Sequence, residues 1–206
     1  MKRMKEQNAQ SSTGGEYVNR KGDRYTLQAG KTKTGKPKYY LGRKITGTPL
    51  QQLPDGYEIY EHPATAIAVV RKITPTQVLP EERRLLEERS RALSGIRHII
   101  VDVEPSALVV YVPGMSDADA DELFSFLGPM MGRRQEANDA IVARSVYMPM
   151  LRFELDDSDR RLFVAQRWCF RGSIDGWFFL SPPRPLAEQV TRYAPHLGKE
   201  SFYELI

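Results

Sequence analysis

The first third of the chain alternates apolar and polar residues over short runs, a pattern typical of half-buried strands. Residues 24–28 place Tyr25 and Leu27 on one face, and residues 38–41 (KYYL) are aromatic and favour a strand. The segment between these two runs is rich in glycine and lysine, which indicates a turn. Residues 24–41 are therefore predicted to form a hairpin with a long loop.

A second hairpin is predicted for residues 57–72. The turn at residues 54–56 (PDG) precedes it, because proline pre-sets its own φ and glycine tolerates a positive φ. The expected strands are residues 57–61 and 66–72, and the loop between them holds His62. Residues 17–73 are thus expected to form a β-rich segment, preceded by a polar, disordered tail at residues 1–16.

The pattern changes after residue 73, where Pro75 and Pro80 mark a predicted boundary. Pro80 and the two glutamates after it suit the start of a helix. Helices are expected at residues 80–93, after a cap at Ser116, in part of 130–143, and at 186–193. Strands are expected at residues 97–103, 107–112, 146–155, 161–170 and 176–180, the last ended by Pro182, Pro183 and Pro185. The predicted fold class is α+β, mainly antiparallel sheet built from hairpins with a few helices, with residues 80–206 as the second domain.

Charge divides the chain at nearly the same place. Residues 1–75 hold 14 lysines and arginines against 6 acidic residues, a net charge of +8, whereas residues 76–206 carry −4. Lysine is concentrated early, and Lys199 is the only lysine after Lys72. This asymmetry favours an anionic partner for the first segment or a domain boundary after it.

The basic hairpin is the strongest candidate site. Lysines neutralise phosphates and exposed tyrosines stack on bases, so a basic ribbon with aromatic residues suits nucleic acid. The expected contacts are Arg20, Lys21, Arg24, Lys31, Lys33, Lys36, Lys38, Tyr39, Tyr40, Arg43 and Lys44. Because Tyr39 and Tyr40 alternate along a strand, at most one of them faces a ligand. The alternative is that the tyrosines fill a small core while the lysines keep an exposed edge strand soluble.

Two other functions stay open. Residues 167–180 (RWCFRGSIDGWFFL) are the densest aromatic stretch, and they belong in a core or, where exposed, in a protein-contact surface. A protein-interaction module is therefore the second hypothesis. The third is an enzyme whose site is assembled from residues scattered along the sequence.

Familiar catalytic motifs fit poorly. Residues 30–37 approach the phosphate-binding loop pattern, but Pro37 stands where that pattern needs Ser or Thr, and a strand follows in place of a helix. Asp102 and Glu104 alternate on one predicted strand and face the same side. Neither is followed by the lysine that would complete a metal-dependent nuclease site. No catalytic residue and no cofactor are predicted.

Metal ligands are also poorly placed. His62, His98 and His196 are far apart and show no ligand spacing with the single cysteine. The aspartates at 156, 157 and 159 begin like a calcium loop but lack its glycine and closing glutamate, so a hairpin turn is expected there. No metal site is predicted.

Composition bounds the location of the protein. No run of about 18 apolar residues occurs, so neither a membrane-spanning helix nor a membrane partner is expected. The basic N-terminus is followed by no apolar stretch and is not read as a secretory signal. Cys169 stands between aromatic residues and is expected to be buried. A lone cysteine without such a signal favours the cytoplasm.

Four segments carry a resemblance. YTLQAGKTKTGKPKYYLGRK with LPDGYEIYEHP near the start, and QRWCFRGSIDGWFFL with APHLGKESFYEL near the end, resemble a group of uncharacterised bacterial proteins. The resemblance covers the two ends better than residues 75–145 and implies that both ends belong to one arrangement. It implies no activity, cofactor or site residue.

Overall fold

A computed structural model describes residues 15–127, 134–170 and 175–205. The chain divides into two compact units, Met1–Thr74 and Pro75–Ile206, which are described separately. Both contain antiparallel sheets, and the second adds the helices. The α+β fold class built from hairpins is confirmed. No helix in the described part of the chain has the length and apolar character needed to cross a membrane.

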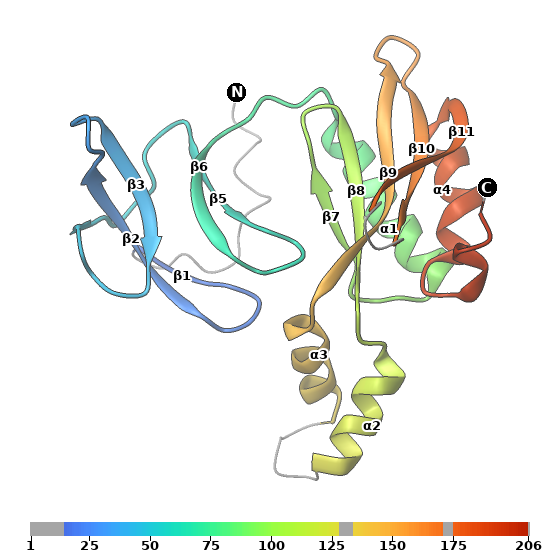
Figure 1. Ribbon diagram of the computed structural model, residues 1–206, viewed down its shortest axis with the longest axis horizontal. Coiled ribbons are helices and arrows are strands. Elements are labelled where there is room, and N and C mark those ends of the chain that lie inside the picture. Colours follow the sequence, from blue (N-terminus) through green and yellow to red (C-terminus); the bar gives the residue numbers. More distant parts are fainter. Residues whose placement is uncertain (1–14, 128–133, 171–174, 206) are drawn as a thin grey trace. The chain divides into compact units, whose positions relative to one another are not determined.

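The described part of the first unit, residues 15–74, contains strands and no helix (Figure 1). Strands β1, β2 and β3 form a sheet in that order, β4 pairs with β2, and β5 and β6 form a separate hairpin. Their bounds are β1 Glu16–Val18, β2 Arg24–Lys31, β3 Pro37–Gly42, β4 Thr48–Pro49, β5 Tyr57–Glu61 and β6 Ala68–Lys72. Both predicted hairpins are therefore present.

The first unit begins earlier than expected. Glu16 pairs with Thr26, and the Leu27 N–H donates to the Gly15 carbonyl at 2.8 Å. Glu16 therefore belongs to the sheet, and Gly15 in the turn before it is hydrogen-bonded to β2, because the edge of β2 offers a partner that composition does not reveal. The remainder of the predicted tail lies outside the described residues.

Two polar contacts tie the β5–β6 hairpin to the rest of the first unit. The Tyr17 hydroxyl donates to Glu61 Oε2 at 2.8 Å, and the Asn19 amide donates to the Ala66 carbonyl at 2.8 Å. Tyr17 and Asn19 are both buried. Burial is the main cause that raises the pKa of Tyr17 well above its ordinary value, and the hydrogen bond to Glu61 adds to it.

The second unit is built on a five-stranded antiparallel sheet in the order β11-β10-β9-β8-β7. The strands are β7 Ile100–Val103, β8 Ala107–Pro113, β9 Tyr147–Asp157, β10 Leu162–Cys169 and β11 Gly176–Pro185. The helices are α1 Pro80–Ser94, α2 Asp117–Leu127, α3 Arg134–Arg144 and α4 Leu186–Tyr193, with short 3-10 turns at Ala194–His196 and Glu200–Phe202.

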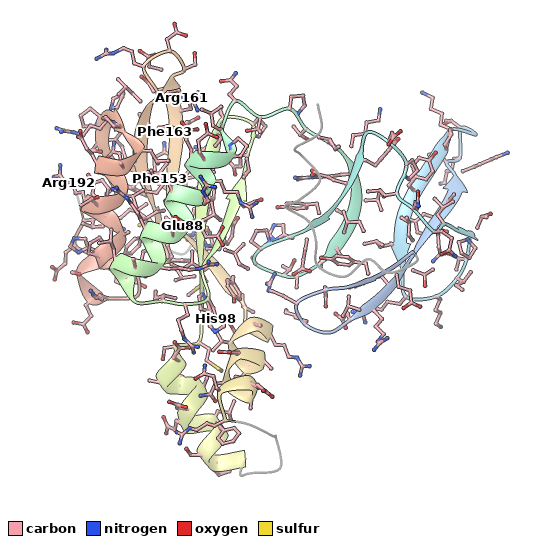
Figure 2. All side chains as sticks on the ribbon, turned by 180° about the vertical axis from the view of Figure 1, so that it is seen from behind. Glu88, His98, Phe153, Arg161, Phe163 and Arg192 are labelled. Atoms are coloured by element: carbon pink, nitrogen blue, oxygen red, sulfur yellow. The ribbon has the colours of Figure 1, made fainter. Side chains whose placement is uncertain are left out.

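Helices α1 and α4 cover one face of this sheet, as seen from behind in Figure 2. The core between them includes Leu86 from α1, Val190 from α4, and the fully buried rings of Phe153 and Phe163 from the sheet. Such burial of large apolar side chains is the main stabilising term for the unit. Helix α1 begins as predicted, with Pro80 in its first turn and Glu82 accepting the Leu79 N–H at 2.8 Å.

Helices α2 and α3 form a hairpin inserted between β8 and β9, and they extend beyond the end of those strands (Figure 1). Arg97 anchors them through two hydrogen bonds to Asp117, at 3.0 and 3.1 Å, and an ion pair with Asp139 at 3.2 Å. The predicted partial helix is α3, and the earlier part of that prediction falls on residues outside the described ranges. Arg97 therefore joins both α2 and α3 to the segment that precedes β7.

The predicted end of the last strand is wrong, and the structure narrows the predicted boundary between the units. Strand β11 continues through its three prolines to Pro185. It is an edge strand, so the residues on its outward side need not donate an N–H to a neighbour, and proline is tolerated there. The boundary falls between Thr74 and Pro75, so residues 75–79 belong to the second unit: Val78 is buried, and the Gln77 N–H donates to the Pro105 carbonyl at 2.8 Å.

Candidate nucleic-acid interface

The β2–β3 hairpin ends in a closed turn, and four lysines lie in this turn and at the strand ends beside it. The last register pairs are Gly30 with Lys38 and Lys31 with Pro37. Beyond them the Thr32 N–H donates to the Lys36 carbonyl at 2.8 Å, and the Gly35 N–H donates to the Thr32 carbonyl at 2.9 Å. Gly35 has a φ of 81°, which favours glycine there. The hydrogen-bonded turn presents the lysines from a defined backbone.

These four lysines, Lys31, Lys33, Lys36 and Lys38, are the hairpin-tip lysines. All four are exposed, and none forms an ion pair with any residue that the structure describes. Residues 24–54 contain seven basic residues and no acidic one. The positive potential at the tip is therefore not cancelled locally.

The tip lysines lie on both faces of the ribbon. Side chains alternate along a strand, so Lys31 shares a face with Leu27 and Ala29, while Lys38 shares the other face with Tyr40. Strand β4 pairs with β2 only at Gln28 and Ala29, which leaves the ribbon two-stranded from Gly30 onward. Positive charge thus surrounds the tip and is not confined to a single face.

Neither tyrosine offers a free ring. Tyr39 packs edge-on against Tyr57 of β5, with ring centroids 4.9 Å apart. The Tyr40 hydroxyl hydrogen-bonds Thr46 at 3.0 Å, and its ring lies against Gly30, where an added Cβ would meet the ring at 3.3 Å. Tyr39 is therefore the tyrosine that packs within the first unit, as expected for one of the pair, and Tyr40 is engaged by its own loop.

The loop between β3 and β4 is held by Gln28, a residue that sequence reasoning missed. Its side chain is fully buried, donates to the Lys44 carbonyl at 2.8 Å, and accepts the N–H groups of Thr46 and Gly47 at 2.7 and 2.8 Å. Lys44 itself is exposed. The only signal in the sequence was a polar glutamine within a strand of alternating residues. That signal does not reveal which loop the glutamine side chain would bind.

The other predicted contacts gather at the opposite end of the hairpin. Seven residue steps separate Arg24 from Lys31, or about 23 Å along β2. Lys21 and Arg24 belong to this distant end, where Arg24 is exposed. The structure does not bring all the predicted contacts into one patch.

Two of the cations at that end are held by carboxylates. Arg20 pairs with Glu61 at 3.1 Å and its side chain is only 10% exposed. Arg43 pairs with Asp23 at 3.0 Å and lies over the ring of Tyr25. Hydrogen bonding to Tyr25, together with the charge of Asp23, raises the pKa of Arg43. Arg20, in the turn after β1, is thus a structural cation that binds the β5–β6 hairpin, and this pairing disfavours the predicted contact with nucleic acid.

The other residues that were considered for catalysis or metal binding make structural contacts. Glu104 accepts a hydrogen bond from Arg152 at 3.2 Å, and Arg152 also binds Glu154 at 2.9 Å. Asp157 caps the turn after β9 by accepting the N–H groups of Asp159 and Arg160. Cys169 is buried, as predicted. Among the residues with described positions, no cluster of three or more histidine, cysteine or carboxylate groups could hold a metal ion.

The aromatic stretch is partly core and partly surface. Trp168 of β10 packs edge-on against Trp177 of β11, with ring centroids 5.0 Å apart. Phe178 and Phe179 are 41% and 62% exposed on the edge strand β11. The exposed part is a candidate protein-contact surface.

Comparison with known proteins adds no further constraint. No protein-family model matches the sequence, and the searches of curated proteins and of solved structures found no match.

Proposed function

We propose that this protein binds nucleic acid, without catalysis, through the hairpin-tip lysines. The observation that carries the proposal is the set of four exposed ammonium groups within residues 31–38. They lie on a hydrogen-bonded turn and the strand ends beside it, and none is paired with a carboxylate among the described residues. A cytoplasmic location stays a prediction from composition.

Electrostatics explain why phosphate is the favoured ligand. A phosphate backbone is a dense line of negative charge, and each lysine that contacts it releases condensed counterions. The tip has no acidic neighbour within residues 24–54 that would repel such a backbone. Lysine is a flexible point charge, so it contacts phosphates without demanding one geometry.

The basic residues at the end of the hairpin opposite the tip differ in how available they are to a ligand. Arg24 and Lys44 are exposed and add to the long-range field that steers a polyanion toward the hairpin. Arg20 is committed to Glu61, and Arg43 to Asp23 and Tyr25. The proposal therefore assigns the contacts themselves to the tip.

The test replaces Lys31, Lys33, Lys36 and Lys38 together with glutamine. If each touches a phosphate, the slope of log affinity against log salt concentration should flatten by about 3–4 units, and low-salt affinity should fall. Binding is measured by fluorescence anisotropy with labelled oligonucleotides between low and physiological salt. Stability should be retained, because exposed lysines contribute little to it.

A charge-matched control separates the tip from net charge. Replacing Arg84, Arg160, Arg184 and Lys199 with glutamine removes the same four charges from exposed positions in the second unit. This control should leave the salt slope nearly unchanged. Equal effects of both quadruple variants would overturn the assignment to the hairpin tip.

The second candidate function is protein binding at the β11 edge. Two neighbouring phenylalanines, Phe178 and Phe179, stay exposed on an edge strand whose first half has neither a charged residue nor a proline. Absence of any nucleic-acid binding at low salt, where weak electrostatic contacts are strongest, would sink the first proposal and promote this one.

A further inference from the structure

The hairpin tip also indicates which form of nucleic acid it suits. Resting on the proposed function, we infer that the ligand is B-form double-stranded DNA and that the two-stranded tip enters the major groove between the two phosphate backbones. Lys31 and Lys38 then contact opposite walls of the groove, and Lys33 and Lys36 reach the groove from the turn.

The first argument is the division of charge between the faces. Lys31 and Lys38 stand on neighbouring strands but on opposite faces of the ribbon. Single-stranded nucleic acid that binds across the surface of a sheet would contact only one of these faces. A ribbon inside a groove has a phosphate backbone on each side, so both lysines are used at once.

The second argument is the shape of the tip. From Gly30 onward β2 and β3 pair only with each other, because β4 reaches no further than Gln28 and Ala29. A free two-stranded ribbon fits the major groove of B-DNA, which is about 12 Å wide. The major groove of double-stranded RNA is deep and too narrow for side chains to enter.

The third argument comes from the tyrosines. Proteins that hold single strands present aromatic rings on which bases stack. Here Tyr39 packs against Tyr57, and Tyr40 lies against Gly30 with its hydroxyl bonded to Thr46. Lys38 also places its ammonium 5.3 Å from the centroid of the Tyr40 ring. The tip therefore lacks an open stacking platform.

The hairpin tip should show little preference for the base sequence of the DNA. The turn carries lysine and threonine, and the hydroxyls of Thr32 and Thr34 lie 3.0 Å apart in a hydrogen bond to each other. Residues 31–38 contain none of the Arg, Asn or Gln side chains that read base edges by paired hydrogen bonds. The contacts are to phosphates, which position a protein without specifying sequence.

The experiment compares three ligands of one sequence: duplex DNA of about 20 base pairs, the corresponding single-stranded DNA, and the same duplex as RNA. Fluorescence anisotropy with the full chain should give a Kd for duplex DNA that is at least about tenfold lower than for either other ligand. The RNA duplex has a similar density of phosphates, so a difference between the two duplexes reports the groove and not charge alone.

Single substitutions test the two-wall geometry. Lys31→Gln and Lys38→Gln should each flatten the salt slope on duplex DNA by about 0.9, and together by about 1.8, because each is expected to contact a separate phosphate. Lys199→Gln, in the second unit, should leave the slope unchanged. An effect from only one of the two tip lysines would overturn the two-wall geometry.

The outcomes separate this inference from the proposed function. Binding to none of the three ligands would remove the proposed function itself. Single-stranded DNA bound as tightly as duplex DNA would overturn this inference while nucleic-acid binding stands. Double-stranded RNA bound as tightly as duplex DNA would likewise rule out insertion into the major groove.

Discussion

Tyr111 is a half-buried phenol on the face of the second sheet opposite the core residues Val110 and Val112. Burial, with smaller contributions from the charges of Asp102 and Glu104, raises its pKa to about 12. The neutral phenol is thus favoured in the folded state, whereas an unfolded tyrosine ionises near pH 10. The resulting stabilisation is complete below about pH 10 and is lost as the pH rises from there through 12.

Tyr111→Phe should therefore reduce the loss of stability between pH 10 and 12. The measurement is urea denaturation across that range, followed by tryptophan fluorescence, since both tryptophans lie in the second unit. Tyr203→Phe is the control, because Tyr203 is 58% exposed. Identical pH dependence in wild type and the Tyr111 variant would contradict the prediction.

At the scale of elements, the α2–α3 hairpin is held by carboxylates with lowered pKa values. Hydrogen bonds from Ser116 lower the pKa of Asp119 at the start of α2. Hydrogen bonds from Asn138 and Arg134 of α3 lower the pKa of Asp121. A carboxyl group whose pKa is lowered by folding stabilises the folded state at pH values above its ordinary pKa near 4. That stabilisation is lost as the pH falls through the lower pKa of the folded state.

The α2–α3 hairpin is accordingly expected to open before the sheet below about pH 4. Hydrogen exchange, corrected for the intrinsic rate at each pH, should show protection falling in α2 and α3 while β8–β10 keep theirs. Asp121→Asn should loosen the same helices at pH 6, since it removes the ionised acceptor of Arg134. Simultaneous loss of protection in helices and sheet would argue against this order.

At the scale of the whole molecule, the boundary between the units lies at the first of the two prolines, between Thr74 and Pro75. Thr76 donates its hydroxyl to the Glu104 carbonyl at 3.1 Å, and Arg161 donates to the Gln77 carbonyl at 3.2 Å. Val78 is 5% exposed and belongs to the core of the second unit. Residues 75–79 therefore stabilise that unit.

Val78→Ala should lower the free energy of unfolding of the second unit by about 1–3 kcal/mol, through lost burial and the cavity left behind. Urea denaturation followed by tryptophan fluorescence reports this unit directly. Leu79→Ala is the matched control, because Leu79 is 40% exposed and should cost little. Indistinguishable midpoints for the two variants would show that residues 75–79 do not stabilise the second unit.

Much of the architecture was predictable because it follows from local rules. The alternation around Tyr25 and Leu27, the proline and glutamates that begin α1, and the turns between strands act over only a few residues. These rules predicted the hairpins, α1, α4 and the burial of Cys169. The charge division between the first and second parts of the chain is likewise a property of the sequence alone.

Only the tertiary structure decided which basic residues remain available to a ligand. Arg20 and Lys31 are both cations in a basic segment, but Arg20 meets Glu61, 41 residues away, once the β5–β6 hairpin docks on β1. The same docking places Tyr57 against Tyr39, and the loop held by Gln28 covers Tyr40. The partner of each side chain depends on how distant elements pack, and no local period or spacing carries that information.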